Sequence, residues 1–159
     1  MKLQDKIKNN TIIYPIQSND KATTIQELLN KLLQQQFLTA TTKLFTFIKD
    51  HDKIMNPAVG RGIAFHHSSS IEVDEMIAVL GISNIGIDYQ SPDQQKVHFI
   101  LLILDPVNEP TLHRKLIHRF QKFINSCNIK TQLLECSSAE QIVQLMYDWE
   151  KKYLLSEEI

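Results

Sequence analysis

The stretch VHFILLIL, residues 97–104, constrains the fold more than any other part of the sequence. Beyond His98, it runs through six large apolar side chains without interruption, Phe99–Leu104. A strand with one solvated face alternates polar and apolar residues, whereas a strand covered on both faces does not need to. The run therefore predicts a central strand that is buried on both sides of a sheet and ends at the Asp-Pro pair 105–106.

Other segments complete an alternation of strands and helices. GIAF (62–65) and MIAVLGI (76–82) are predicted strands, and IIYPI (12–16) is a shorter one near the start. Apolar residues at helical spacing predict helices from Thr23, over Thr42–Ile54, from Pro110 and after Ser137. Because helices flank a strand-rich middle, we expect an α/β fold, a mixed β-sheet flanked by helices in a single layered domain over residues 1–159. The order of the strands does not follow from the sequence.

The sequence also predicts how these helices begin and which way they face. Thr24 with Glu27 and Ser137 with Glu140 each fit a capping box, in which two side chains satisfy free N–H groups at a helix start. In the second helix, we expect Leu44, Phe47 and Ile48 to face inward.

Composition excludes several classes of function. Lys and Arg number 17 against 18 Asp and Glu, so bulk charge gives no reason to expect a nucleic-acid partner. The two cysteines form no repeated metal spacing, and the first ten residues, MKLQDKIKNN, lack the apolar core of a signal peptide. No apolar run approaches the roughly 20 residues that span a bilayer. We expect a cytoplasmic protein without membrane insertion.

Histidines are the candidate reactive groups. His66 and His67 are adjacent in a predicted strand, so their side chains point to opposite faces. His113 lies in the first turn of the helix that follows Pro110, on its apolar edge, whereas His118 falls on the polar face and is expected at the surface. A neutral imidazole can act as a nucleophile toward phosphorus, and a second histidine can donate a hydrogen bond to phosphoryl oxygens. His67 and His113 could supply these roles; scattered structural histidines are the alternative that spacing leaves open.

A metal site is a second alternative. Its ligands would be His51, His66, His67 and Asp105. Adjacent histidines in a strand cannot easily bind one ion, and no HxH or HxxxH spacing is present. The sequence therefore favours chemistry without a metal.

Three segments together resemble a known family. GRGIAFHHSSS, VHFILLILDP and the histidine two residues after Thr111 are similar to the enzyme IIA domain of the phosphoenolpyruvate-dependent sugar phosphotransferase system, of the mannitol/fructose type that includes nitrogen-regulatory IIA proteins. The family pattern Gly-x-Gly-(Ile/Val)-Ala-Ile-Pro-His corresponds to residues 60–67. This resemblance, which covers nearly the whole chain, implies that His67 is phosphorylated, that His66 replaces the proline, and that His113 is the second active-site histidine.

The sequence departs from the family around this pocket. The family usually has Arg-Glu at the end of the second helix, where the arginine supports the phosphoryl site, and an ungapped count puts His51-Asp52 there. Arg61 stands between the two glycines, where the family commonly has Asn. Arg61 either neutralises phosphoryl charge, for which a guanidinium is suited, or faces solvent. Ser68 either donates a hydrogen bond to the phosphoryl group or belongs to a serine-rich turn, which needs no function and is favoured.

The resemblance implies phosphoryl transfer without a nucleotide, cofactor or metal. The histidine-containing phosphocarrier protein would phosphorylate His67, and a IIB domain cysteine would receive the phosphoryl group in a sugar-uptake role. In a regulatory, nitrogen-type role, the phosphorylation state would instead control binding to target proteins. The altered pocket favours the regulatory role, and a non-phosphorylated interaction protein that keeps only the fold stays open.

Overall fold

The computed structural model describes residues 1–157 and contains one five-stranded sheet. The strands are β1 (Ile12–Ile13), β2 (Ala58–Gly60), β3 (Ile63–Ser70), β4 (Ile77–Ile87) and β5 (Val97–Pro106), in the spatial order β1-β4-β5-β3-β2. β5 is central: it pairs parallel with β3 and antiparallel with β4. The sheet is therefore mixed, as predicted.

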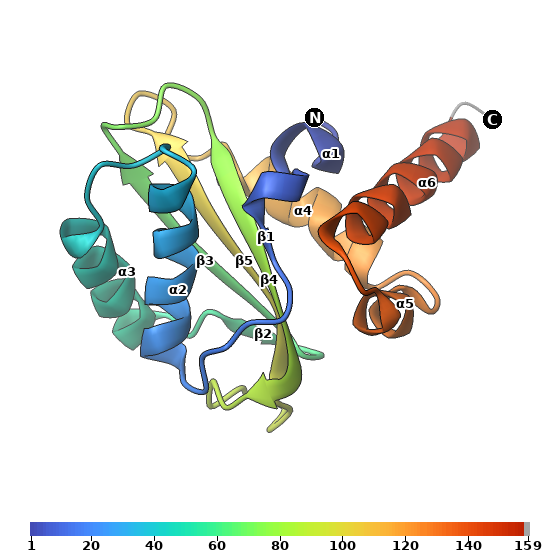
Figure 1. The fold of residues 1–159 in the computed structure, drawn as a ribbon, viewed down its shortest axis with the longest axis horizontal. Helices are drawn as coiled ribbons and strands as arrows, with labels where there is room; N and C mark the ends of the chain where they lie inside the picture. Colours follow the sequence, from blue (N-terminus) through green and yellow to red (C-terminus); the bar gives the residue numbers. More distant parts are fainter. Residues whose placement is uncertain (158–159) are drawn as a thin grey trace.

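Helices cover both faces of this sheet (Figure 1). α2 (Lys21–Gln34) and α3 (Thr42–Ile54) lie on one face. The other face carries α1 (Leu3–Lys6), α4 (His113–Ile124), α5 (Ile129–Glu135) and α6 (Ala139–Glu157), and a short 3₁₀ turn η1 (Asn9–Thr11) precedes β1. This arrangement confirms the expected α/β layered fold.

β5 separates two apolar cores. Phe99, Leu101 and Ile103 belong to the core under α4 and α6. Ile100, Leu102 and Leu104 belong to the core under α2 and α3. Every residue of β5 except His98 is buried. The prediction of a strand covered on both faces is confirmed, because each face of the sheet has its own helical layer.

Several predicted helix starts are wrong by a few residues. α2 begins at Lys21, where Asp20 accepts a hydrogen bond from the Thr23 backbone N–H (2.8 Å), so the Thr24 and Glu27 capping box does not form. Glu27 instead accepts from the Ser18 hydroxyl at 2.6 Å. Thr24 and Glu27 have the spacing of a capping box, but the loop before α2 folds back so that Ser18 donates to the Glu27 carboxylate.

The start of α6 and the start of α4 are also displaced. α6 begins at Ala139, and the Ser138 hydroxyl, rather than that of Ser137, accepts from the Gln141 backbone N–H at 3.2 Å. α4 begins at His113, and Pro110 lies in the turn before it.

Three further expectations need correction. Phe47, expected to face inward, is 65% exposed, because α3 packs on the core through Leu44, Ile48 and the partly buried Phe45. The predicted strand over residues 12–16 is limited to its first two residues. The short helices α1 and α5 were not predicted, because neither is long enough to show an apolar period.

The sheet has an open edge beside β3. β2 pairs with β3 at Ile63 and Ala64, and the Phe65 backbone N–H donates to the Pro57 oxygen at 3.0 Å, so β3 beyond Phe65 has a neighbour on one side only, β5. That remainder includes the serines, which extend β3 to Ser70 opposite Pro106 rather than forming the favoured turn. Pairing with β5 supplies the backbone hydrogen bonds that a turn would otherwise provide. Within residues 1–157, no helix is both long and apolar enough to cross a bilayer.

Candidate active site

The two adjacent histidines of β3 point to opposite faces of the sheet. His66 contacts Tyr89, which belongs to the core under α2 and α3, and His67 contacts His113 of α4 on the other side. The alternation of a strand produces this division, as the sequence predicted. Of the two, His67 contacts helices from both faces, α3 through His51 and α4 through His113.

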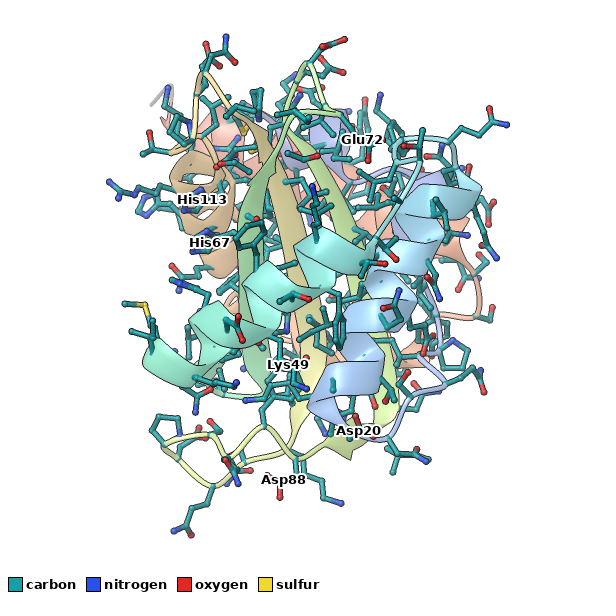
Figure 2. The ribbon with its side chains drawn as sticks, turned by 90° about the vertical axis from the view of Figure 1, so that its left-hand side faces the viewer. Asp20, Lys49, His67, Glu72, Asp88 and His113 are labelled. Carbon is teal, nitrogen blue, oxygen red and sulfur yellow. The ribbon has the colours of Figure 1, made fainter. Side chains whose placement is uncertain are left out.

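His67 lies between two other imidazoles. Its ring stacks on that of His113, with centroids 3.9 Å apart and planes inclined by 11°. The ring of His51, near the end of α3, meets it edge-on at 5.2 Å. Figure 2 shows His67 and His113 next to each other at one edge of the sheet. The structure therefore brings together three histidines that lie far apart in the sequence.

Asp105 fixes the orientation of His113. One carboxylate oxygen accepts a hydrogen bond from the backbone N–H of His113 (3.0 Å), and the other lies 2.5 Å from the ring nitrogen Nδ1. Both residues are buried, Asp105 with 1% of its surface exposed. Since a carboxylate accepts hydrogen bonds, Nδ1 carries the proton toward Asp105, and the other ring nitrogen, Nε2, is left for a further partner.

The surroundings of His67 keep its ring neutral. Burial, followed by the neighbouring His113 and His51, lowers the pKa of His67 to about 4. At neutral pH its ring therefore has a free lone pair, which a nucleophilic imidazole needs.

Arg114 is the arginine close enough to affect this histidine. Its charge contributes to the lowered pKa of His67, and it directly follows His113 in the first turn of α4. Sequence reasoning missed Arg114, because it falls on the polar face of its helix.

Arg61 is not part of this site, contrary to one of the two expectations. It lies in the turn before β3, where its backbone N–H donates to Asp93 at 2.7 Å. The strand from Ile63 to His67 alone covers about 13 Å at 3.3 Å per residue. Arg61 therefore lies beyond the start of β3, away from His67, and the expectation that it neutralises phosphoryl charge is not supported by its position.

Ser68 shares the face of β3 with His66 rather than with His67, because side chains alternate along the strand. Its hydroxyl donates to the backbone oxygen of Ser69 at 3.4 Å. The expectation that Ser68 donates to a phosphoryl group on His67 is therefore not supported by its position.

His66 belongs to a buried polar group on the opposite face. Its Nε2 lies 3.0 Å from the Tyr89 hydroxyl, and its Nδ1 lies 3.2 Å from a carboxylate oxygen of Asp52. The second pair does not have hydrogen-bond geometry, and neither atom has another hydrogen-bond partner in the described structure. Burial, with the charge of Asp52, raises the pKa of Tyr89, so its hydroxyl keeps the proton that it shares with His66. His66 is thus a packing residue, and His118 is exposed as expected.

The site also bears on the metal alternative and on the role of Asp105. Among residues 1–157, no three or more His, Cys, Asp or Glu side chains are grouped to hold a metal ion. The sequence suggested Asp105 only as a metal ligand, although a carboxylate at the end of a buried apolar run is itself a signal for a paired partner.

Comparison with known proteins defines the class of this chain. The family model described as "Phosphoenolpyruvate-dependent sugar phosphotransferase system, EIIA 2" matches residues 5–149, so the chain belongs to this family. Its curated relatives include a nitrogen regulatory protein of Bradyrhizobium diazoefficiens, 24% identical over 92% of this chain and 95% of the relative. A fructose-specific EIIABC component of Bacillus subtilis is 25% identical over 95% of this chain. The chain spans only 24% of that longer protein.

Solved structures share the fold. The nitrogen regulatory protein IIA-Ntr from Neisseria meningitidis superposes with a TM-score of 0.80 at 18% identity, covering 91% of this chain and 98% of that protein. IIA mannitol from Escherichia coli gives a TM-score of 0.75 at 15% identity, over 89% and 99% of the two chains. Regulatory and sugar-specific proteins thus both occur among the similar structures.

Proposed function

We propose that residues 1–159 form one phosphotransferase domain in which His67 is the phosphoryl acceptor. The observation that carries the proposal is a neutral imidazole at the open edge of the sheet, stacked on a second imidazole that a buried carboxylate orients. The reaction moves a phosphoryl group from the phosphohistidine of a carrier protein to a ring nitrogen of His67. The new N–P bond forms as the carrier's N–P bond breaks, and the carrier's imidazole is the leaving group.

The neighbours of His67 have distinct roles in this proposal. His113, held by Asp105, orients the phosphoryl group through the ring nitrogen that Asp105 leaves free. Arg114 supplies positive charge for a phosphoryl group that carries close to two negative charges. His51 borders the site from α3. His113 is fixed by Asp105 before the phosphoryl group arrives, and such preorganised groups are how charge is stabilised in transfer reactions.

An apolar surface beside the site fits protein partners. Phe47 and Ile54 of α3 are 65% and 87% exposed and lie at helical spacing on either side of His51, and Met55, directly after the helix, is 64% exposed. Exposed apolar side chains beside a reactive group are typical of a docking surface. We assign this surface to the phosphocarrier protein and to the next recipient. One similar structure is a complex of the mannitol enzyme IIA with its phosphorylated enzyme IIB partner.

We favour a regulatory, nitrogen-type role over direct sugar uptake. Relatives of both kinds match the chain at similar identity, 24% for the nitrogen regulatory protein and 25% for the fructose-specific component, so the preference rests on the residues of the pocket. His51 and His66 occupy positions where the family pattern usually has arginine and proline, and a pocket altered in this way fits a signalling role better than fast sugar uptake. In this role, phosphorylation of His67 changes the charge beside the α3 surface and thereby selects the bound target.

The experiment mixes the purified protein with phosphoenolpyruvate, the first enzyme of the system and the phosphocarrier protein. Intact-mass measurement should show one acid-labile phosphate, and His67→Gln should remove it while His118→Gln retains it. A protein that acquires no phosphate is an interaction protein that keeps only the fold. Transfer from the phosphorylated protein to a IIB cysteine would support the sugar-uptake role instead.

A further inference from the structure

Arg61 lies at an unusual backbone position that the proposed function does not use. Its φ is 59°, between Gly60 at 89° and Gly62 at 80°. A left-handed conformation suits glycine or asparagine, whereas a long side chain adopts it at a cost. The turn itself therefore gives no reason for an arginine here, and the reason must lie with its side chain.

Arg61 lines a cavity together with two lysines. This cavity measures about 660 Å³, and its charged lining residues are Arg61, Lys96, Lys130 and Asp93. The cavity also borders His98 but lies away from His67: Asp88, in the same β4–β5 connection as Asp93, is at the lower end of the molecule in Figure 2, well below His67. The whole chain carries a net charge of −1, so this concentration of positive charge is local.

The one carboxylate of the cavity is already occupied. Asp93 accepts hydrogen bonds from the Arg61 backbone N–H (2.7 Å), the Ser91 hydroxyl (2.7 Å) and the Gln95 backbone N–H (3.2 Å). In the described part of the chain, none of the three cations forms an ion pair. Asp93 thus holds the turn. Its single negative charge offsets only part of the positive charge of Arg61, Lys96 and Lys130, so the cavity keeps an excess of positive charge.

Lys130 is held in this position against repulsion. Its ammonium donates to the backbone oxygen of Arg61 at 2.8 Å, which fixes it beside the turn. Burial and the charge of Arg61 lower the pKa of Lys130. An anion between the two cations would relieve this repulsion, because each cation would gain an opposite charge.

We propose that Arg61, Lys96 and Lys130 form a binding site for a small molecule that carries a phosphate group or several carboxylates. The site is separate from His67, and the guanidinium of Arg61 supplies its two-point contact. Its volume lies within the range of small-molecule pockets and is small for a macromolecular partner.

The test measures binding of pyrophosphate and of citrate to the unphosphorylated protein by calorimetry, with backbone amide shifts recorded by NMR. At least one of the two anions should bind and shift the amides of residues 60–62 and 93–98. Arg61→Asn and Lys130→Gln should each weaken binding at least about tenfold, as expected for a charged hydrogen bond. Binding of pyrophosphate alone identifies a phosphate ligand, and binding of citrate alone identifies a carboxylate ligand.

Two control variants distinguish binding in this cavity from binding at the histidines or at exposed lysines. Lys43→Gln removes an exposed charge elsewhere and should leave binding unchanged, and His67→Ala should also retain it. Equal weakening by Lys43→Gln, loss of binding in His67→Ala, or no binding of either anion at millimolar concentration overturns the proposal. Arg61→Asn should fold with an equal or higher unfolding midpoint, which excludes misfolding as the cause of lost binding. None of these measurements depends on phosphorylation of His67.

Discussion

Asp105 contacts His113 at two atoms, the backbone N–H at 3.0 Å and the ring nitrogen Nδ1 at 2.5 Å. The carboxylate therefore fixes both the start of α4 and the direction of the imidazole. His113 in turn stacks on His67, so a buried aspartate that does not touch the reacting atoms sets the geometry of the site.

Asp105→Asn should slow phosphorylation of His67 without preventing folding. The amide keeps an acceptor for the backbone N–H but loses the anionic acceptor for Nδ1. The loss of a charged hydrogen bond corresponds to about 1.5–3 kcal/mol, or roughly 10–100-fold in rate. Single-turnover transfer from the phosphocarrier protein measures it. Asp74→Asn, at an exposed position, should leave the rate unchanged; an equal effect of both substitutions would contradict the role of Asp105.

The phosphorylated fraction at equilibrium should depend on Arg114 and not on Arg61. Arg114→Gln removes the cation that acts on His67 and should lower the ratio of phosphorylated to free protein about two- to fivefold, the 0.5–1 kcal/mol typical of an exposed charge pair. Arg114→Lys should retain most of the effect. Phosphorylation at matched carrier concentration, followed by intact mass, checks this, with Arg61→Gln as the control. If Arg61→Gln lowers the ratio more than Arg114→Gln, the cation has been assigned to the wrong residue.

The lowered pKa of His67 should make the protein less stable in acid. In the unfolded chain this imidazole binds a proton near pH 6.5, whereas in the folded protein it does so only near pH 4. Between these values the unfolded state binds more protons, so the free energy of unfolding rises with pH and reaches its full value above about pH 6.5. Partial exposure of the ring reduces the expected change from roughly 3 to about 1 kcal/mol.

Urea unfolding of two variants between pH 4.5 and 7.5 measures this pH dependence. His67→Gln should flatten it, and His118→Gln, which changes an exposed ring, should preserve it. An NMR titration that finds His67 protonated near pH 6.5 in the folded protein would rule out the buried, neutral nucleophile.

Tyr89→Phe should destabilise the protein by about 1–3 kcal/mol, the cost of leaving a buried polar atom without its partner. The substitution removes the hydroxyl that lies 3.0 Å from His66 Nε2 and adds no volume. The free energy of unfolding in urea measures the effect, and Tyr147→Phe, at a side chain that is 45% exposed, is the matched control. A loss below about 0.5 kcal/mol in the Tyr89 variant, on the scale of a surface substitution, would mean that water or Asp52 satisfies His66 instead.

The sequence by itself determined that the sheet is covered on both faces and that His66 and His67 point to opposite faces of their strand. The uninterrupted apolar run of β5 required cover on both faces of the sheet. The helices predicted before and after this run provide that cover, one layer on each face. Because side chains alternate between the two faces of a strand, the sequence alone places His66 and His67 on opposite faces. These properties depend on local periodicity, which each segment carries within its own residues.

Only the tertiary structure decided which groups meet at the site. Asp105 and Arg114 act on the histidines because β5 ends where α4 begins, and Arg61 is excluded because the turn that carries it lies at the other end of β3. Phe47 has the apolar character of a core residue but lies at the surface, since α3 contacts the sheet along a narrow stripe. Distances between elements depend on strand order and register, and contacts between residues far apart in the chain set these rather than any local pattern.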